Sequence, residues 1–229
     1  MRKTFITIFF LVGFLIQTSQ LYAKKPQRFA DIAFVWVKNG YWMSVYEVTQ
    51  DQYQSIMGVN PSIQIGNNHP VESVSWFDAV KFCEELTKKA DKLGQLPKGY
   101  VFSLPTSAEW EFAAKSGTQD TVNKFAGCDS LNNVGWFKGN SKNMHHSVGQ
   151  KKPNKFGIFD LTGNVWEWCL DSLPENKTGK KGEETRIKRG GCYFNDEKTC
   201  LITNLGEMDP KAKGHRYGIR LVLAKRNLR

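Results

Sequence analysis

The stretch that decides the fold is Phe156–Asp171, FGIFDLTGNVWEWCLD. Gly163 allows a backbone conformation with positive φ, so the first part of the stretch predicts a tight turn. Trp166 and Trp168 then alternate with Glu167 at the two-residue period of a strand. Two tryptophans on one face of a strand are typical of a sheet core, because each ring buries about 150–250 Å². One interpretation is therefore a core strand that follows a tight turn.

The same stretch also offers hard oxygen ligands. Asp160 and Glu167 lie on either side of the glycine turn, whose carbonyl groups add further oxygens. Ligand sets made only of oxygen suit calcium. The second interpretation is therefore that the turn wraps a calcium ion. These residues alone leave both interpretations open.

Composition predicts a globular chain with a basic surface. The 229 residues are 40% hydrophobic and 13% aromatic, which suits one large domain or two small ones. Seven Trp and fifteen Phe exclude a disordered chain. The formal charge of +10 could serve a nucleic acid or an acidic glycan, but Lys and Arg are scattered apart from small groups near Lys151 and Lys180. We therefore expect a solvated basic surface and no nucleic-acid partner.

Residues 1–23 resemble a secretory signal peptide. Arg2 and Lys3 precede the apolar run Thr4–Ile16, which is shorter than the roughly 20 residues that a spanning helix needs. An uncleaved membrane anchor is the alternative. The signal-peptide interpretation predicts export to the periplasm, the outer membrane surface or the extracellular space. The mature chain, residues 24–229, is then expected to have no transmembrane span.

Three capping boxes predict three helices of about 8–14 residues. The pairs are Thr49 with Gln52, Ser75 with Asp78, and Thr106 with Glu109. Phe34–Val48 and Tyr217–Leu223 are rich in aromatic and β-branched residues and predict strands. After Gly117, recurrent Asn, Gly, Ser and Pro predict long loops between short strands. The pattern predicts a single α+β domain with much irregular structure.

Seven segments of this chain resemble motifs of the formylglycine-generating enzyme family, also called the sulfatase-modifying factor family. They are VYEVTQDQY at Val45–Tyr53, MGVNPS at Met57–Ser62, HPVESVSWFDAVKFC at His69–Cys83, LPTSAEWEFAA at Leu104–Ala114, VGQKKPNKFGIFDLTGNVWEW at Val148–Trp168, KRGGCYFND at Lys188–Asp196 and HRYGIRLV at His215–Val222. The resemblance covers about residues 34–224. It implies a variant of the C-type lectin-like fold over a single domain, residues 24–229.

The resemblance also implies a calcium site in the opening stretch. Asp160 and Glu167 would supply side-chain oxygens, and Gly163 and Val165 would supply carbonyl oxygens. Asp160 stands where the enzymes of the family usually have Asn, and it keeps the oxygen while adding a charge. The family thus supports the second interpretation of this stretch, with calcium as the expected cofactor.

The chemistry of the family is only partly represented in this chain. The resemblance implies oxidation of a cysteine in a client sulfatase, with oxygen and a copper ion held by two thiolates, a soft ligand that selects Cu(I). Here the matching stretch is Gly190–Cys200, GGCYFNDEKTC. Cys192 replaces the family's active-site serine, Asn195 stands at the first copper cysteine, and Cys200 matches the second. Cys192 and Cys200 are therefore the candidate catalytic residues of an incomplete site.

Two functions remain open at this point. Cys192 and Cys200 can form a structural disulfide, stay as unpaired buried thiols or hold a metal ion, and an odd total of five Cys leaves at least one without an intramolecular partner. Loss of the copper pair favours a monomeric, non-catalytic binding or scaffold module of the cell envelope, with a protein or glycan ligand. The alternative is a copper-dependent oxidase of the formylglycine-generating type that modifies a cysteine of a client protein.

Overall fold

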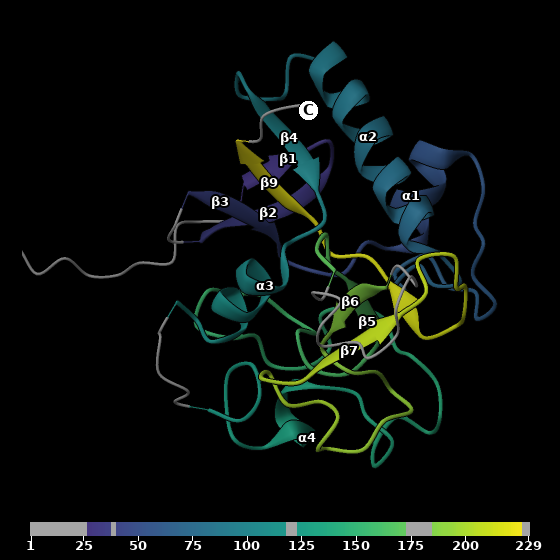
Figure 1. The fold of residues 1–229 in the computed structure, drawn as a ribbon, viewed down its shortest axis with the longest axis vertical. Helices are drawn as coiled ribbons and strands as arrows, with labels where there is room; N and C mark the ends of the chain where they lie inside the picture. Colours follow the sequence, from purple (N-terminus) through teal and green to yellow (C-terminus); the bar gives the residue numbers. More distant parts are fainter. Residues whose placement is uncertain (1–26, 38–39, 118–122, 173–184, 226–229) are drawn as a thin grey trace, which may run out of the picture.

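The computed structural model describes residues 27–37, 40–117, 123–172 and 185–225. Within these residues the chain forms two sheets and four helices, an α+β arrangement in which long loops fill the lower half of Figure 1. The five-stranded sheet contains β1 (Gln27–Phe29), β2 (Ile32–Val37), β3 (Tyr41–Ser44), β9 (Val222–Lys225) and β4 (Tyr100–Ser103), in that order. The four-stranded sheet contains β7 (Leu205–Met208), β6 (Arg186–Arg189), β5 (Trp166–Trp168) and β8 (Tyr217–Gly218).

The end of the chain is tied into the middle of the five-stranded sheet. Val222 of β9 lies opposite Met43 of β3 on one side and Ser103 of β4 on the other, both antiparallel. The prediction that the C-terminal strand joins a sheet is confirmed. The prediction of one continuous strand over Tyr217–Leu223 is wrong, because β8 joins the four-stranded sheet and β9 joins the five-stranded one. The residues between them cross from one sheet to the other.

The three predicted helices begin at their predicted caps. They are α1 (Gln50–Met57), α2 (Trp76–Lys92) and α3 (Ser107–Ala114), and each has both hydrogen bonds of a capping box. α2 has 17 residues and exceeds the expected length, because its buried stripe continues from Ala79 to Ala90. α4 (Leu131–Val134) is a single turn. In Figure 1, α1 and α2 lie on the same side of the five-stranded sheet.

The two tryptophans of the opening stretch belong to the core, as predicted. Trp168 is fully buried and Trp166 nearly so. Glu167 between them is also buried, so β5 has no solvent-facing side. This short strand therefore carries a carboxylate into the interior of the molecule, where it needs a partner.

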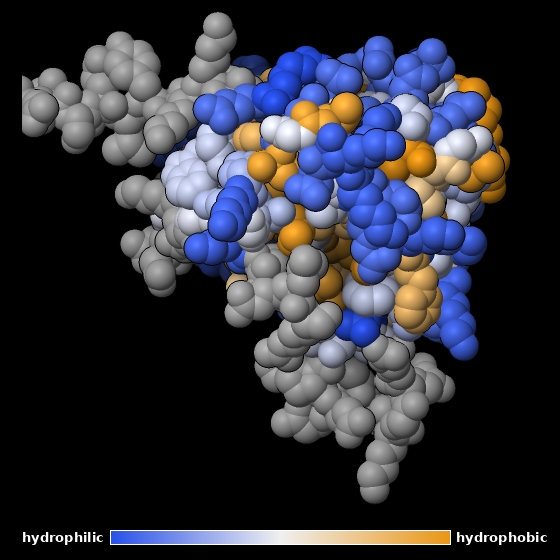
Figure 2. All heavy atoms as spheres, turned by 90° about the horizontal axis from the view of Figure 1, so that it is seen from above, coloured by the Kyte–Doolittle hydropathy of each residue, from blue (hydrophilic) through white to orange (hydrophobic). Residues whose placement is uncertain are grey.

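Figure 2 shows a mostly hydrophilic upper face with apolar side chains at its right-hand edge. No helix within the described ranges is long and apolar enough to span a membrane. The predicted signal peptide, residues 1–23, lies outside the described residues, as does most of the predicted polar loop 172–185.

Candidate functional site

The two candidate sites adjoin each other. The Gly163 N–H donates to the Gly190 carbonyl over 2.9 Å, and the Tyr193 N–H donates to the Asn164 carbonyl over 2.8 Å. These bonds join the turn of the opening stretch to the loop that carries the candidate catalytic cysteines. A change in one of the two segments is therefore transmitted directly to the other.

The turn is built from left-handed backbone conformations. Asp160, Gly163 and Asn164 have φ angles of 58°, 82° and 56°. A Cβ atom at position 163 would lie 2.1 Å from the Trp136 carbonyl oxygen, so only glycine fits there. The predicted tight turn is thus confirmed, and it directs the side chains of the flanking acidic residues inward.

Glu167 is held by two side chains from distant parts of the sequence. The Nε atom of Arg220 lies 2.9 Å from both carboxylate oxygens, and its Nη2 atom lies 2.8 Å from Oε1. The Trp110 indole N–H donates to Oε2. Arg220 also donates to the Ser44 and Phe159 carbonyls. The ion pair is completely buried and well satisfied, the arrangement in which a buried charge is tolerated.

Two further carboxyl groups lie in the same buried region. Asp160 Oδ2 accepts a hydrogen bond from the Gly149 N–H over 2.6 Å, while Oδ1 is buried without a partner among the described residues. Glu47 accepts from Asn164 Nδ2 over 2.6 Å and from the Val165 N–H over 3.2 Å.

The surroundings make the ionised form of these two carboxyl groups unfavourable. Burial raises the pKa of Asp160 to about 6, and the nearby Glu167 adds to the shift. Burial, followed by repulsion from Asp160 and Glu167, raises the pKa of Glu47 well above its ordinary value. A bound cation would reverse this effect and favour both carboxylates.

The residues fit a cation on the Asp160 side of this region. Arg220 is the cation that compensates Glu167, while Asp160 Oδ1 has no partner, which is the feature that a bound cation would satisfy. Glu167 would have to share its oxygens with Arg220. In the described part of the chain, no three or more His, Cys, Asp or Glu side chains form a group that could hold a metal ion. The calcium set Asp160, Gly163, Val165 and Glu167 therefore stays a prediction.

Sequence reasoning missed Glu47, Trp110 and Arg220. All three lie in segments quoted for the family resemblance, but nothing local shows that they meet Glu167. Their partners are far apart in the sequence, and Arg220 lies in the segment that was predicted to be a continuous strand. An arginine within an apolar run such as YGIRLVL is the one available signal, since a buried arginine needs a carboxylate partner.

The candidate catalytic cysteines are both buried. The Cys192 thiol donates to Asn195 Oδ1 over 3.0 Å, and the Cys192 N–H donates to the same oxygen over 3.0 Å. Asn195, at the position of the missing copper cysteine, thus acts as an acceptor for Cys192. All five cysteines are free thiols in the structure, so of the three alternatives it contains the unpaired buried thiols.

The environment of these thiols opposes thiolate formation. Burial raises the pKa of Cys192. Burial, together with the neighbouring Cys192, raises the pKa of Cys200 to about 12. Metal-binding and nucleophilic cysteines instead have lowered pKa values and accessible sulfur atoms. Both thiols are therefore protonated at neutral pH.

Comparisons with known proteins agree with the motifs. Residues 13–225 match the family described as the sulfatase-modifying factor enzyme 1-like domain. The chain is 31% identical to "Chaperone protein LppX" of Paenibacillus barcinonensis over 81% of its own length and 80% of the relative's. It is 30% identical to the formylglycine-generating enzyme of Mus musculus over 62% of its own length, a match that spans 40% of the mouse enzyme.

A solved structure shows the same fold. "Treponema denticola variable protein 1" superposes with a TM-score of 0.74 and 26% identity, over 88% of this chain and 99% of that one. The expected α+β fold, a variant of the C-type lectin-like fold, is confirmed. The chain belongs to the sulfatase-modifying factor enzyme 1-like family.

Proposed function

We propose that this chain is a non-catalytic binding or scaffold module of the cell envelope. The observation that carries the proposal is the state of the Gly190–Cys200 loop. Its two thiols are buried, their pKa values are raised, and Asn195 stands where the second copper thiolate is required. A copper oxidase needs two reachable thiolates, and this loop provides neither.

A protein is the ligand that the comparisons favour. The similarity to a protein named as a chaperone covers about four fifths of both chains, and a chaperone acts on other proteins. The predicted signal peptide, residues 1–23, supports export and places this activity in the envelope. On this proposal the rigid lectin-like core holds loops that contact the ligand, and no bond in the ligand is made or broken.

The test is an attempt to detect the oxidase. The mature chain, supplied with calcium, is incubated with copper, reductant, oxygen and a cysteine-containing sulfatase peptide, and the mass of the peptide is followed. We expect no formylglycine, while an active enzyme of the family gives product under the same conditions. Circular dichroism of the same sample shows whether the chain is folded.

Product formation would overturn the proposal in either of two ways. Product that disappears in Cys200→Ser would establish the oxidase at the candidate site. Product that persists in Cys200→Ser would establish an oxidase at another site. Mass spectrometry of the exported protein tests the location, with Lys24 as the expected N-terminal residue and an intact Met1 in the membrane as the contrary result.

A further inference from the structure

One stretch of this highly charged chain contains no charged residue. Asp, Glu, Lys and Arg make up 24% of the sequence, yet none occurs in residues 52–71. This stretch covers most of α1 and the loop that follows it, residues 58–70, here called the 58–70 loop. The absence of charge is a property that interface centres share, because desolvating charged groups is costly.

The 58–70 loop exposes aliphatic side chains to solvent. Val59, Ile63 and Ile65 are 61%, 70% and 69% exposed. A single exposed aliphatic residue on a protein surface is ordinary, but three on one short uncharged loop are not explained by the folding of this domain. Their exposure contributes nothing to the core and leaves apolar surface available to a partner.

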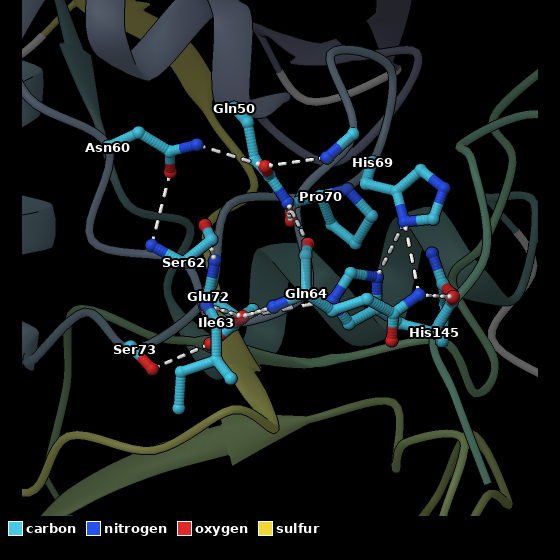
Figure 3. Close-up of polar contacts among 12 residues, drawn as sticks. Gln50, Asn60, Ser62, Ile63, Gln64, His69, Pro70, Glu72, Ser73 and His145 are labelled. Carbon is cyan, nitrogen blue, oxygen red and sulfur yellow. Dashed lines mark hydrogen bonds and ion pairs between the residues drawn. The ribbon is translucent and has the colours of Figure 1, made fainter.

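A buried glutamine fixes the loop from the inside. Gln50, 1% exposed, donates through Nε2 to the Gln64 carbonyl over 2.8 Å. Its Oε1 atom accepts from Asn60 Nδ2 over 3.0 Å and from the Gly66 N–H over 3.1 Å (Figure 3). One side chain at the start of α1 thus holds three points along the loop.

A buried carboxylate holds the segment that carries the exposed isoleucines. Glu72 Oε1 accepts from the N–H groups of Ile63 and Gln64, and Oε2 accepts from the Ser73 hydroxyl over 2.6 Å (Figure 3). Burial alone would raise the pKa of Glu72, but a nearby His145 and these hydrogen bonds hold it below its usual value. The anion therefore anchors the loop, while the Ile63 side chain remains outside.

The loop is also tied to a second segment of the chain. Gln64 Nε2 donates to the His145 carbonyl over 2.7 Å, and the Nδ1 atoms of His69 and His145 lie 3.1 Å apart (Figure 3). The loop is consequently ordered before any partner arrives. A partner would not have to provide the free energy of ordering it, which is the main benefit of preorganisation.

We propose that the 58–70 loop is the docking surface for an apolar, uncharged polypeptide segment of a client protein, with Ile63 and Ile65 as its main contacts. This inference rests on the proposed function, because it names the surface that the binding module uses. The charge pattern decides among partners. Nucleic acid and anionic lipid surfaces are bound through Lys and Arg, which this stretch lacks. An apolar peptide instead matches both its exposed side chains and its lack of charge.

The test uses two synthetic peptides of equal length and fluorescence anisotropy. One peptide contains only Leu, Val, Ser and Gly, and in the other several Leu and Val positions are replaced by Lys and Glu. The full mature chain is compared with a variant carrying Ile63→Asn and Ile65→Asn. The matched control carries Phe77→Asn and Leu93→Asn, which change two exposed apolar residues of α2 and its C-cap.

We expect the chain to bind the apolar peptide and not the charged one. The loop variant should bind at least about tenfold more weakly, and the α2 control within about twofold of the unmodified chain. Amide exchange in the loop variant should leave the Gln64 and Gly66 amides protected, which shows that the loop keeps its conformation.

Four results would overturn the proposal: no peptide binding by the folded chain, equal binding of both peptides, equal weakening in both variants, or binding to lipid vesicles in place of peptide. A dimer that dissociates only in the loop variant, seen by sedimentation without peptide binding, would also overturn it by making a second copy the occupant. The oxidase assay is independent, so formylglycine formation would remove the non-catalytic proposal while leaving the peptide result to be judged separately.

Discussion

The five-stranded sheet and the four-stranded sheet of this molecule are held together by different forces. α2 packs apolar side chains such as Phe82 and Leu86 into a core that includes Leu223 of β9. Around the four-stranded sheet the strands are short, and buried side chains satisfy much of the irregular backbone. Arg220 donates to two carbonyls there, and Glu47 accepts from a backbone N–H.

This difference shows how a domain with little regular structure can still be specific. A loop that enters the interior must satisfy its N–H and carbonyl groups, and where no strand is adjacent a buried charged side chain can do so. Such a side chain has one correct position, so it also fixes the path of the loop. The same region pays a cost in sensitivity, because losing one partner leaves another charge buried and unpaired.

Removing Arg220 should have the largest effect on this comparison. Arg220→Met leaves the buried Glu167 without its cation, and we expect a loss of about 3–5 kcal/mol in the free energy of unfolding, measured in urea. Amide exchange should rise first around the four-stranded sheet. Leu86→Ala is the matched change in the other region, with a loss of about 2–5 kcal/mol and faster exchange around α2.

The Arg220 prediction has an internal control. The double variant Arg220→Met with Glu167→Gln removes both charges and should be more stable than Arg220→Met alone. If Arg220→Met were as stable as the unmodified chain, or if the double variant were the less stable of the two, the buried ion pair would not be what holds this region together.

Calcium should act on the region of the four-stranded sheet and should depend on pH. We propose that a calcium ion binds at Asp160, where one carboxylate oxygen lacks a partner. At a concentration a hundredfold above the dissociation constant, binding adds about 2.7 kcal/mol of stability. The melting temperature should therefore fall with chelator and recover with calcium, and Asp160→Asn should reduce the recovery more than Asp51→Asn, an exposed change on α1.

The sign of the pH dependence follows from the raised pKa of Asp160, about 6. The folded chain without calcium holds this proton more tightly than the unfolded chain, so its stability decreases as the pH rises from the ordinary value of 3.8 through about 6. Calcium must displace the proton and should bind more weakly below about pH 6. A melting curve indifferent to chelator and calcium at neutral pH would contradict the calcium site.

A smaller pH effect is expected in the 58–70 loop, outside the region of the four-stranded sheet. Burial, followed by the nearby His145 and His146, lowers the pKa of His69 from 6.5. The neutral ring is thus favoured in the folded chain, and its contribution to stability is lost as the pH falls below 6.5 toward the lowered value. Amide exchange at Gln64 should accelerate over this range, and His69→Gln should abolish the pH dependence. A pH-independent rate in the unmodified chain would refute this link.

The features that could be predicted from the sequence are those with local causes. The capping boxes at Thr49, Ser75 and Thr106 lie within one helical turn, and all three helices begin where these residues predict. The glycine at position 163 likewise indicated the turn, because a close approach of backbone to backbone requires it. The seven ordered motifs added the fold, which neither composition nor periodicity could provide.

The features that could not be predicted depend on contacts between distant segments. Tyr217–Leu223 has the composition of one strand, and nothing local shows that it divides between two sheets. Glu167 was interpreted as a calcium ligand because its local surroundings contain oxygens, whereas its immediate partners are Arg220 and Trp110. The exposed isoleucines of the 58–70 loop resemble core residues in the sequence, and only their solvent exposure distinguishes them.

The central claim, that the cysteine loop is inert and the domain non-catalytic, is tested most directly by the reactivity of the thiols in the folded chain. The native protein is exposed to an alkylating reagent at about pH 7.5, and each cysteine is followed by peptide mass spectrometry. Cys128, which is only partly buried, serves as the internal reference. We predict that Cys192 and Cys200 stay unmodified while Cys128 reacts, since burial and raised pKa values suppress thiolate formation. Modification of Cys200 at the rate of Cys128 or faster would contradict the account and favour the oxidase.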